Sequence, residues 1–173
     1  QMVGKLTEIE VQAALAVGDS LSGENLAGLN LAFLDLKGAD FSYCDLRYTV
    51  FTESDLSDVN FQRADLGGAN LSKSLLNKVN FSGSILRWAI LSGAHIASSD
   101  FSYCHALEAN FEDTKINRCG FTHADIRRCL FSRSAIKDSD FSFSNIANSD
   151  FTEVDTSTVL FEGSNQHGTL FTQ

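Results

Sequence analysis

The sequence contains no proline and no run of about 18 consecutive apolar residues of the kind that forms a membrane-spanning helix. Without a proline-rich linker, the 173 residues are expected to form a single ordinary domain. Basic residues are also few, since 13 Lys and Arg stand against 22 Asp and Glu, for a formal net charge of −9. We therefore expect neither a membrane span nor direct binding to nucleic acid.

Motifs of common catalytic and nucleotide-binding sites are also missing. The chain contains no P-loop, no G-x-S-x-G and no H-E-x-x-H. Cys104, His105, Cys119 and His123 follow no zinc-ligand spacing. We therefore predict that the protein is not an enzyme and has no catalytic, cofactor-binding or metal-binding residues.

What the sequence does contain is a pentapeptide repeat. Between Leu21 and Phe171 every fifth residue is Leu, Ile or Phe at all but three of 31 positions, and 12 of the 14 Phe fall in this register. We call this position the centre of each repeat. The exceptions are Ala106, Thr156 and Gln166. A period of five matches neither an α-helix nor a β-strand, and it fits a chain that turns a corner once in every repeat.

The residues around each centre also follow a rule. The residue two before the centre is usually small, and the residue immediately before it is Asp or Asn at 18 of the 31 positions. Ten of the 22 acidic residues are Asp at this position, where Asp and Asn interchange. Such interchange indicates an acceptor that caps the backbone of a turn rather than a general acid or base.

Segments such as "ADLGG" (Ala64–Gly68), "ANLSK" (Ala69–Lys73), "VNFSG" (Val79–Gly83) and "SDFSF" (Ser139–Phe143) resemble the A(D/N)LXX unit of the pentapeptide-repeat family. The resemblance implies an all-β solenoid, a right-handed quadrilateral parallel β-helix with four repeats per coil. The chain would form about 7.5 such coils. Folded at four repeats per coil, the Phe centres stack on two opposite faces, and Leu and Ile occupy most centres of the other two.

Residues 1–18 are expected to form an N-terminal capping helix and residues 19–173 the β-helix. Thr7 and Glu10 have the spacing of a capping box, and Gly18 would end the helix. Leu6, Ile9, Ala13 and Val17 are expected to form the stripe that covers the first coil. The C-terminal end shows no equivalent cap, and the alternatives are a further domain at that end, a homodimer formed through it, or another partner that covers it.

All four cysteines lie two residues before a centre, where small inward-facing side chains belong. We expect buried, reduced thiols that act as small hydrophobic groups, which suits the cytoplasm or another reducing compartment. A secreted effector stays open as an alternative.

The outer faces then carry the function. We expect a noncatalytic interaction module or structural scaffold with a protein partner. The family resemblance also includes bacterial proteins that protect DNA gyrase, where an acidic rod is thought to mimic DNA. The alternative is therefore a DNA-mimicking, gyrase-binding protein of the quinolone-resistance type.

Two groups of exposed residues are candidates for the contact. The related segments "LRYTVF" (Leu46–Phe51), "LRWAIL" (Leu86–Leu91) and "IRRCLF" (Ile126–Phe131) recur on every second coil. They define a ridge that comprises Arg47, Tyr48, Arg87, Trp88, Arg127 and Arg128. A second group, the aromatic edge, comprises Tyr43, Tyr103 and Phe143. Duplication of a two-coil unit, alternating turn geometry and stacking of corner aromatics on neighbouring turns are the purely structural alternatives.

Overall fold

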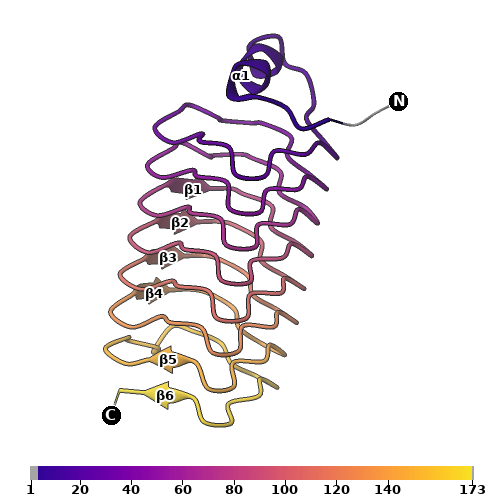
Figure 1. Ribbon diagram of the computed structural model, residues 1–173. Helices are drawn as coiled ribbons and strands as arrows, with labels where there is room; N and C mark the ends of the chain where they lie inside the picture. The colour runs from indigo at the N-terminus through magenta and orange to yellow at the C-terminus, as the bar shows by residue number, and fades with distance from the viewer. Residues whose placement is uncertain (1–3, 173) are drawn as a thin grey trace.

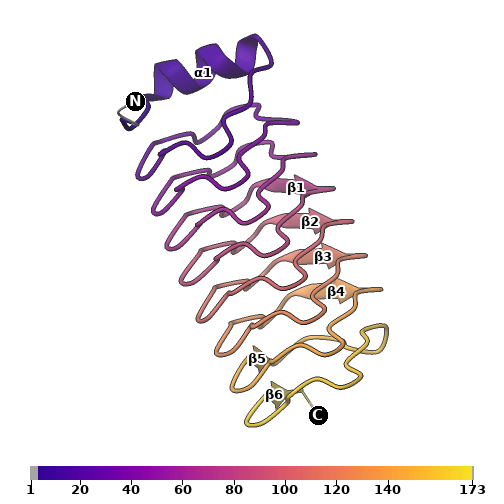
Figure 2. The ribbon, with the colours of Figure 1, turned by 90° about the vertical axis from the view of Figure 1, so that its right-hand side faces the viewer.

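The computed structural model describes residues 4–172 as a rod of stacked coils with one helix across its N-terminal end (Figures 1 and 2). The fold is a right-handed quadrilateral β-helix, as expected. The larger of its two ladders of named strands joins four parallel strands, in the order β1 (Leu75–Asn77), β2 (His95–Ala97), β3 (Lys115–Asn117) and β4 (Ala135–Lys137). A second ladder pairs β5 (Asp150–Phe151) with β6 (Leu170–Phe171). Leu75 pairs with His95 and Asp150 with Leu170, so each coil contains four repeats, as predicted.

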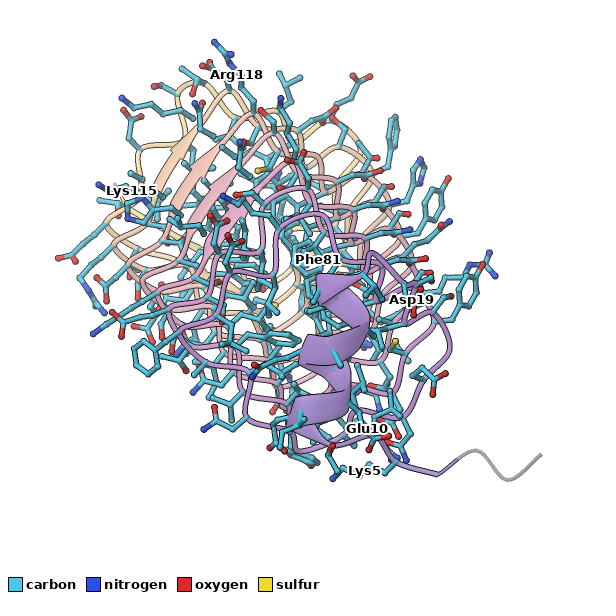
Figure 3. The ribbon with its side chains drawn as sticks, turned by 90° about the horizontal axis from the view of Figure 1, so that it is seen from above. Lys5, Glu10, Asp19, Phe81, Lys115 and Arg118 are labelled. Carbon is cyan, nitrogen blue, oxygen red and sulfur yellow. The ribbon has the colours of Figure 1, made fainter. Side chains whose placement is uncertain are left out.

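The centre residues fill the interior. Seen along the rod axis, Phe81 lies inside the coils, whereas Lys115 and Arg118 project outward (Figure 3). The rings from Phe41 to Phe161 on one face stack at 4.4–5.6 Å between centroids. Those from Phe111 to Phe171 on the opposite face stack at 4.7–5.6 Å. Edge-to-face contacts such as Phe101–Phe111, at 6.0 Å between ring centroids, join the two stacks of rings. The predicted stacking of Phe rings on two opposite faces is therefore confirmed.

Backbone N–H groups are fully paired in a typical repeat. One N–H donates to a carbonyl of the previous coil, and two donate to carbonyls of the next coil. A fourth closes the turn, and the fifth donates to the side chain of the Asp or Asn before the centre. In residues 60–64 the bonds run from Asn60 N to Ala39 O (3.0 Å), Phe61 N to Asn80 O (2.8 Å), Arg63 N to Ser82 O (3.0 Å), Ala64 N to Phe61 O (3.0 Å) and Gln62 N to Asn60 Oδ1 (2.9 Å). A buried N–H without a partner is costly, so each coil depends on its neighbours.

The corners, two residues after each centre, lie in the left-handed region of backbone space. Every corner from 23 to 168 except Thr158 has a positive φ between 52° and 77°, including aromatic residues such as Tyr48 (60°) and Trp88 (62°). This conformation is unfavourable for residues other than Gly. The coil-to-coil hydrogen bonds therefore hold this conformation even with aromatic, charged and amide side chains at the corner.

The cap helix α1 (Glu8–Ala16) has the predicted capping box. The Glu10 N–H bonds Thr7 Oγ1 at 3.3 Å, and the Thr7 N–H bonds Glu10 Oε1 at 3.1 Å. The prediction for its buried face was right for Leu6 and wrong for Ile9, Ala13 and Val17. Ile9 and Val17 are 80% and 74% exposed, whereas Val11 is fully buried.

Alongside Val11, Leu6, Ala14 and Leu15 pack on the core. Because the helix is short, its apolar pattern does not determine which face is buried. The angle at which the helix meets the rod determines it. Residues 1–3 of the predicted cap lie outside the described residues, and the boundary at residues 18 and 19 stays a prediction.

The regular path breaks near Thr158. After β5 the chain swings away from the ladder of strands β1 to β4 (Figures 1 and 2). Thr156 replaces an apolar centre, and Thr158 is β-branched, so it disfavours the left-handed corner. The Thr158 hydroxyl instead accepts the Asp138 N–H at 2.9 Å.

Phe101 and Phe33 form a matched pair that tests the repeat register. Phe101 is fully buried between Phe81 and Phe121, at 4.5 Å from each, whereas Phe33 is a corner residue that is 72% exposed. We expect Phe101→Ala to lower the free energy of unfolding by about 3–5 kcal/mol through loss of packing and a cavity. Phe33→Ala should change it by less than about 0.5 kcal/mol. Urea denaturation followed by circular dichroism measures both, and similar losses would contradict this assignment.

Candidate interaction surface

Side chains at the corners lean over the next coil toward the C-terminus. A methyl group added at Gly163 would collide with the Phe143 ring, and one at Gly68 would collide with the Tyr48 ring. Corner residues one coil apart therefore form columns along the rod, and a Gly in a column is covered by the side chain before it. The ridge and the aromatic edge are two such columns together with their neighbours.

The ridge begins with an ion pair. Arg47 donates from Nε to Asp45 Oδ1 at 2.9 Å and from Nη2 to Asp45 Oδ2 at 2.8 Å. The Asp45 Oδ1 atom also accepts the backbone N–H of Arg47 at 3.2 Å. The guanidinium hydrogen bonds lower the pKa of Asp45, and its partial burial opposes them only in part.

The same arrangement returns at the third ridge unit. Arg127 donates to Asp125 Oδ1 at 2.7 Å and to Oδ2 at 2.8 Å. Burial works to raise the pKa of Asp125, but the hydrogen bonds from Arg127 outweigh it and the pKa is lowered. Arg128 lies 3.8 Å from Glu108, which occupies the corner of the previous coil. Of the three arginines that recur on every second coil, Arg47 and Arg127 are thus held by local carboxylates.

Arg87 differs from Arg47 and Arg127. The residue two before it is Ile85, so the carboxylate that holds the other two is missing. Its guanidinium carbon lies 5.7 Å from the centre of the Trp88 ring, within the range of a cation–π contact. Among residues 4–172 no carboxylate forms an ion pair with Arg87. Trp88 is 51% exposed and Tyr48 is 64% exposed.

A slot of about 190 Å³ separates Tyr48 from Trp88. Asp65, Gly67 and Ile85 also line it, together with Arg47 and Arg87. The repeat "LGGAN" that separates the two ridge units supplies Gly67 and Gly68 at the two outward positions. This slot was not predicted from the sequence. The signal was present, because folding the chain at four repeats per coil places Gly68 between Tyr48 and Trp88.

The structure joins only part of the aromatic edge. The Tyr103 and His123 rings stack at 4.9 Å and the His123 and Phe143 rings at 5.4 Å, nearly parallel in both cases. Tyr43 lies in the same column, but Arg63 and Gly83 intervene before Tyr103. His123 therefore belongs to the edge as the ring that connects its two aromatic neighbours.

The Asp and Asn residues before the centres act as the turn-capping acceptors that the sequence indicated. In all 18 repeats with Asp or Asn at this position, Oδ1 accepts the backbone N–H two residues on. Ten of the acidic residues therefore have a structural role.

The four cysteines are buried and unpaired. Burial raises the pKa of Cys44 and of Cys119 to about 11, so both remain thiols at neutral pH. They also donate hydrogen bonds, for example from Cys44 Sγ to Leu21 O at 3.0 Å and from Cys129 Sγ to Ala106 O at 2.8 Å. Thr49 and Ser54 make the same bond from equivalent positions. The burial of this position was predicted from the sequence, but its role as a hydrogen-bond donor was not.

No cluster of three or more His, Cys, Asp or Glu side chains suited to a metal ion occurs within residues 4–172. In the same part of the chain, no helix has the length and apolar character needed to cross a membrane.

The family model described as pentapeptide repeats matches residues 20–58, 54–93 and 94–133, with 8 copies. The chain belongs to the pentapeptide-repeat family. Comparison with curated protein sequences gives no significant match. Among solved structures, trypsin-treated QnrB1, a plasmid-mediated fluoroquinolone resistance protein, is 16% identical with a TM-score of 0.53. The alignment covers 85% of this pentapeptide-repeat protein and 88% of that chain.

Two further pentapeptide-repeat structures are similar over most of their length. HetL, involved in heterocyst differentiation regulation in the cyanobacterium Nostoc, is 19% identical with a TM-score of 0.44, and the match covers 96% of this chain and 97% of that one. A protein of the Arabidopsis thaliana thylakoid lumen is 27% identical with a TM-score of 0.39, covering 72% and 70% respectively. The likeness to QnrB1 shows the shared fold alone.

Substitutions of Asp45 separate two roles of the residue before the centre, which are to cap the turn and to pair with an Arg. Asp45→Asn keeps the turn-capping acceptor and removes the charge that pairs with Arg47. Because that ion pair is largely exposed, we expect a loss of under about 1 kcal/mol at pH 7. Since the folded-state pKa of Asp45 is lowered, this contribution is present above its unfolded pKa of about 3.9 and disappears as the pH falls through the folded value.

Asp45→Ala also removes the hydrogen bond to the backbone and should cost about 1 kcal/mol more, at acidic pH as well as at pH 7. Urea denaturation of the wild type and both variants at pH 7 and pH 3 measures these differences. Equal losses in the two variants would contradict the capping role.

Proposed function

We propose that this pentapeptide-repeat protein is a noncatalytic interaction module or structural scaffold that binds a protein partner through the ridge. The observation that carries the proposal is the exposed cluster of Tyr48, Arg87 and Trp88. Aromatic residues and Arg are enriched among the residues that contribute most to binding at protein interfaces. Here they stand on a rigid backbone, which limits the entropy lost when a partner binds.

The carboxylates of the repeats support a noncatalytic role. Those that precede the centres accept backbone hydrogen bonds in the turns, as Asp45 and Asp125 do. The four thiols are buried and are poor nucleophiles in that environment. Buried, unpaired cysteines also favour a reducing compartment for the protein, such as the cytoplasm.

The second candidate is a DNA-mimicking protein that binds a topoisomerase such as gyrase. The net charge of −9 favours it, and QnrB1, a fluoroquinolone resistance protein, has the same fold. Ten of the acidic residues, however, have the structural role described above. Others are paired with Arg, as in the contacts of Arg133 with Glu112 (2.8 Å) and Asp113 (3.0 Å). These pairings reduce the continuous negative field that a DNA mimic requires, so we place this candidate second.

Exposed apolar residues also lie on the last coil. Leu160 and Leu170 are 60% and 56% exposed. A homodimer or a further domain at this end is a separate proposal from the ridge.

A double variant tests the ridge. Arg87→Ala with Trp88→Ala should weaken binding to the partner recovered by pull-down about 30-fold or more, because hot-spot residues contribute about 2 kcal/mol or more each. Arg118→Ala with Phe33→Ala, an Arg and an aromatic corner residue outside the ridge and the aromatic edge, should leave binding within about threefold. Equal retention of the partner by both double variants would contradict the ridge.

The DNA-mimic candidate has its own assay. It requires inhibition of gyrase supercoiling at micromolar concentrations of the protein. Inhibition that survives the ridge double variant would favour this candidate over the first.

A further inference from the structure

The corner column of the ridge lacks a ring between Tyr48 and Trp88. In the neighbouring column His123 lies between Tyr103 and Phe143, and its ring stacks on both. In the ridge column the equivalent middle position is Gly68. Neighbouring coils are about 4.8 Å apart, so two rings that are separated by one coil have room for a third ring between them.

The slot has a volume suited to one aromatic ring. It measures about 190 Å³, and a cavity of about 150 Å³ is known to hold benzene. Tyr48 forms one wall and Trp88 the other, with Gly67 between them. The Tyr48 ring rests on Gly68, which has no side chain to hold the ring at a distance. Both walls are exposed, so the slot is open to an approaching side chain.

Asp65 lines the slot and its Oδ1 accepts the backbone N–H of Gly67 at 3.0 Å, but the carboxylate that would hold Arg87 is missing. Arg47 and Arg127 each bind an Asp two residues earlier in the chain, through paired hydrogen bonds. Arg87 has Ile85 at that position, and among residues 4–172 no carboxylate pairs with it. Its guanidinium lies over the Trp88 ring at the edge of the slot. A group that fills the slot can therefore place a carboxylate on Arg87.

We propose that the slot receives an aromatic side chain of a partner protein and that Arg87 binds an acidic residue adjacent to that side chain. This inference rests on the proposed interaction function and specifies its partner. The partner supplies the ring that Gly68 lacks and the carboxylate that Ile85 lacks. Stacking between two aromatic walls supplies the orientation, and the charged hydrogen bond to Arg87 supplies selectivity for an acidic neighbour.

Trp88 provides a direct probe, because it is the only Trp in the chain. The peptide N-acetyl-Asp-Phe-Asp-amide contains the proposed elements and does not absorb at the red edge of the Trp band, where Trp88 can be excited alone. We expect a saturable change in Trp88 emission with a dissociation constant of about 1 mM, as is usual for a small fragment. N-acetyl-Asn-Phe-Asn-amide should bind about tenfold more weakly, because it lacks the charge. N-acetyl-Asp-Ala-Asp-amide should give no saturable change.

Three variants that keep Trp88 locate the site. Tyr48→Ala removes a wall and should weaken binding of the Asp-Phe-Asp peptide about tenfold. Ile85→Asp introduces a carboxylate at the position equivalent to Asp45 and Asp125. This carboxylate should form an ion pair with Arg87. This variant should weaken Asp-Phe-Asp binding about tenfold and leave Asn-Phe-Asn binding within about twofold. Phe33→Ala, an exposed corner aromatic outside the ridge and the aromatic edge, should leave both affinities unchanged.

A lack of any saturable response to the Asp-Phe-Asp peptide up to about 20 times the expected dissociation constant of about 1 mM would overturn the proposal. Equal weakening of both peptides by Ile85→Asp would overturn the role of Arg87. The proposed interaction function is contradicted by a different result, namely retention of the partner by the ridge double variant. A negative peptide titration alongside partner loss in that variant would therefore reject the slot and leave the ridge as the contact surface.

Discussion

The hydrogen bonds between successive coils constrain the rest of this structure. In a repeat such as residues 60–64, three of five backbone N–H groups reach an adjacent coil, so no coil can satisfy its own backbone. Because every partner lies one full coil away, a single inserted residue would shift every later centre out of the interior. The repeat accordingly continues from Leu21 to Phe171 without an insertion. Local contacts between neighbouring coils thus account for both the length of the coil and the regularity of the sequence.

The same ladder determines how the surface is displayed. Tyr48, Trp88 and Tyr103 have positive φ values, which would be unfavourable in an isolated turn. The coil-to-coil bonds hold each corner in this conformation, so its side chain is free to vary without changing the fold. A residue at a corner is therefore placed on a fixed grid, one coil apart from its neighbours. Rings at adjacent points of the grid stack, as Tyr103 and His123 do, and a Gly at one point leaves a gap.

The sequence was sufficient wherever the period of five determines the environment. It predicted the interior positions, the capping role of Asp and Asn, and the Thr7–Glu10 box of α1. It was not sufficient where three-dimensional placement decides the outcome. The buried face of α1 contains Val11 instead of Ile9, because the angle at which the helix meets the rod is not encoded in its short apolar pattern. The departure of the chain near Thr158 depends on a backbone conformation that a β-branched residue disfavours.

The two-coil period of the ridge contains two kinds of replacement. One is the loss of Asp or Asn before a centre, and the other is the loss of the Asp that binds a ridge Arg. Val50, Ile90, Leu130 and Leu170 replace Asp or Asn before a centre, so loss of that acceptor is common and does not by itself indicate a function. Ile85 differs because of its neighbours. Its place in the column holds Asp45 one ridge unit earlier and Asp125 one unit later, and each of these Asp residues fixes an Arg. Replacing that Asp with Ile gives up a turn-capping hydrogen bond and leaves Arg87 over an exposed Trp88. Natural proteins tend to depart from a local structural rule where function requires it. The departure at Ile85 coincides with the slot beside Gly67 and Gly68, and this coincidence is our reason for proposing a contact surface rather than a simple duplication of coils.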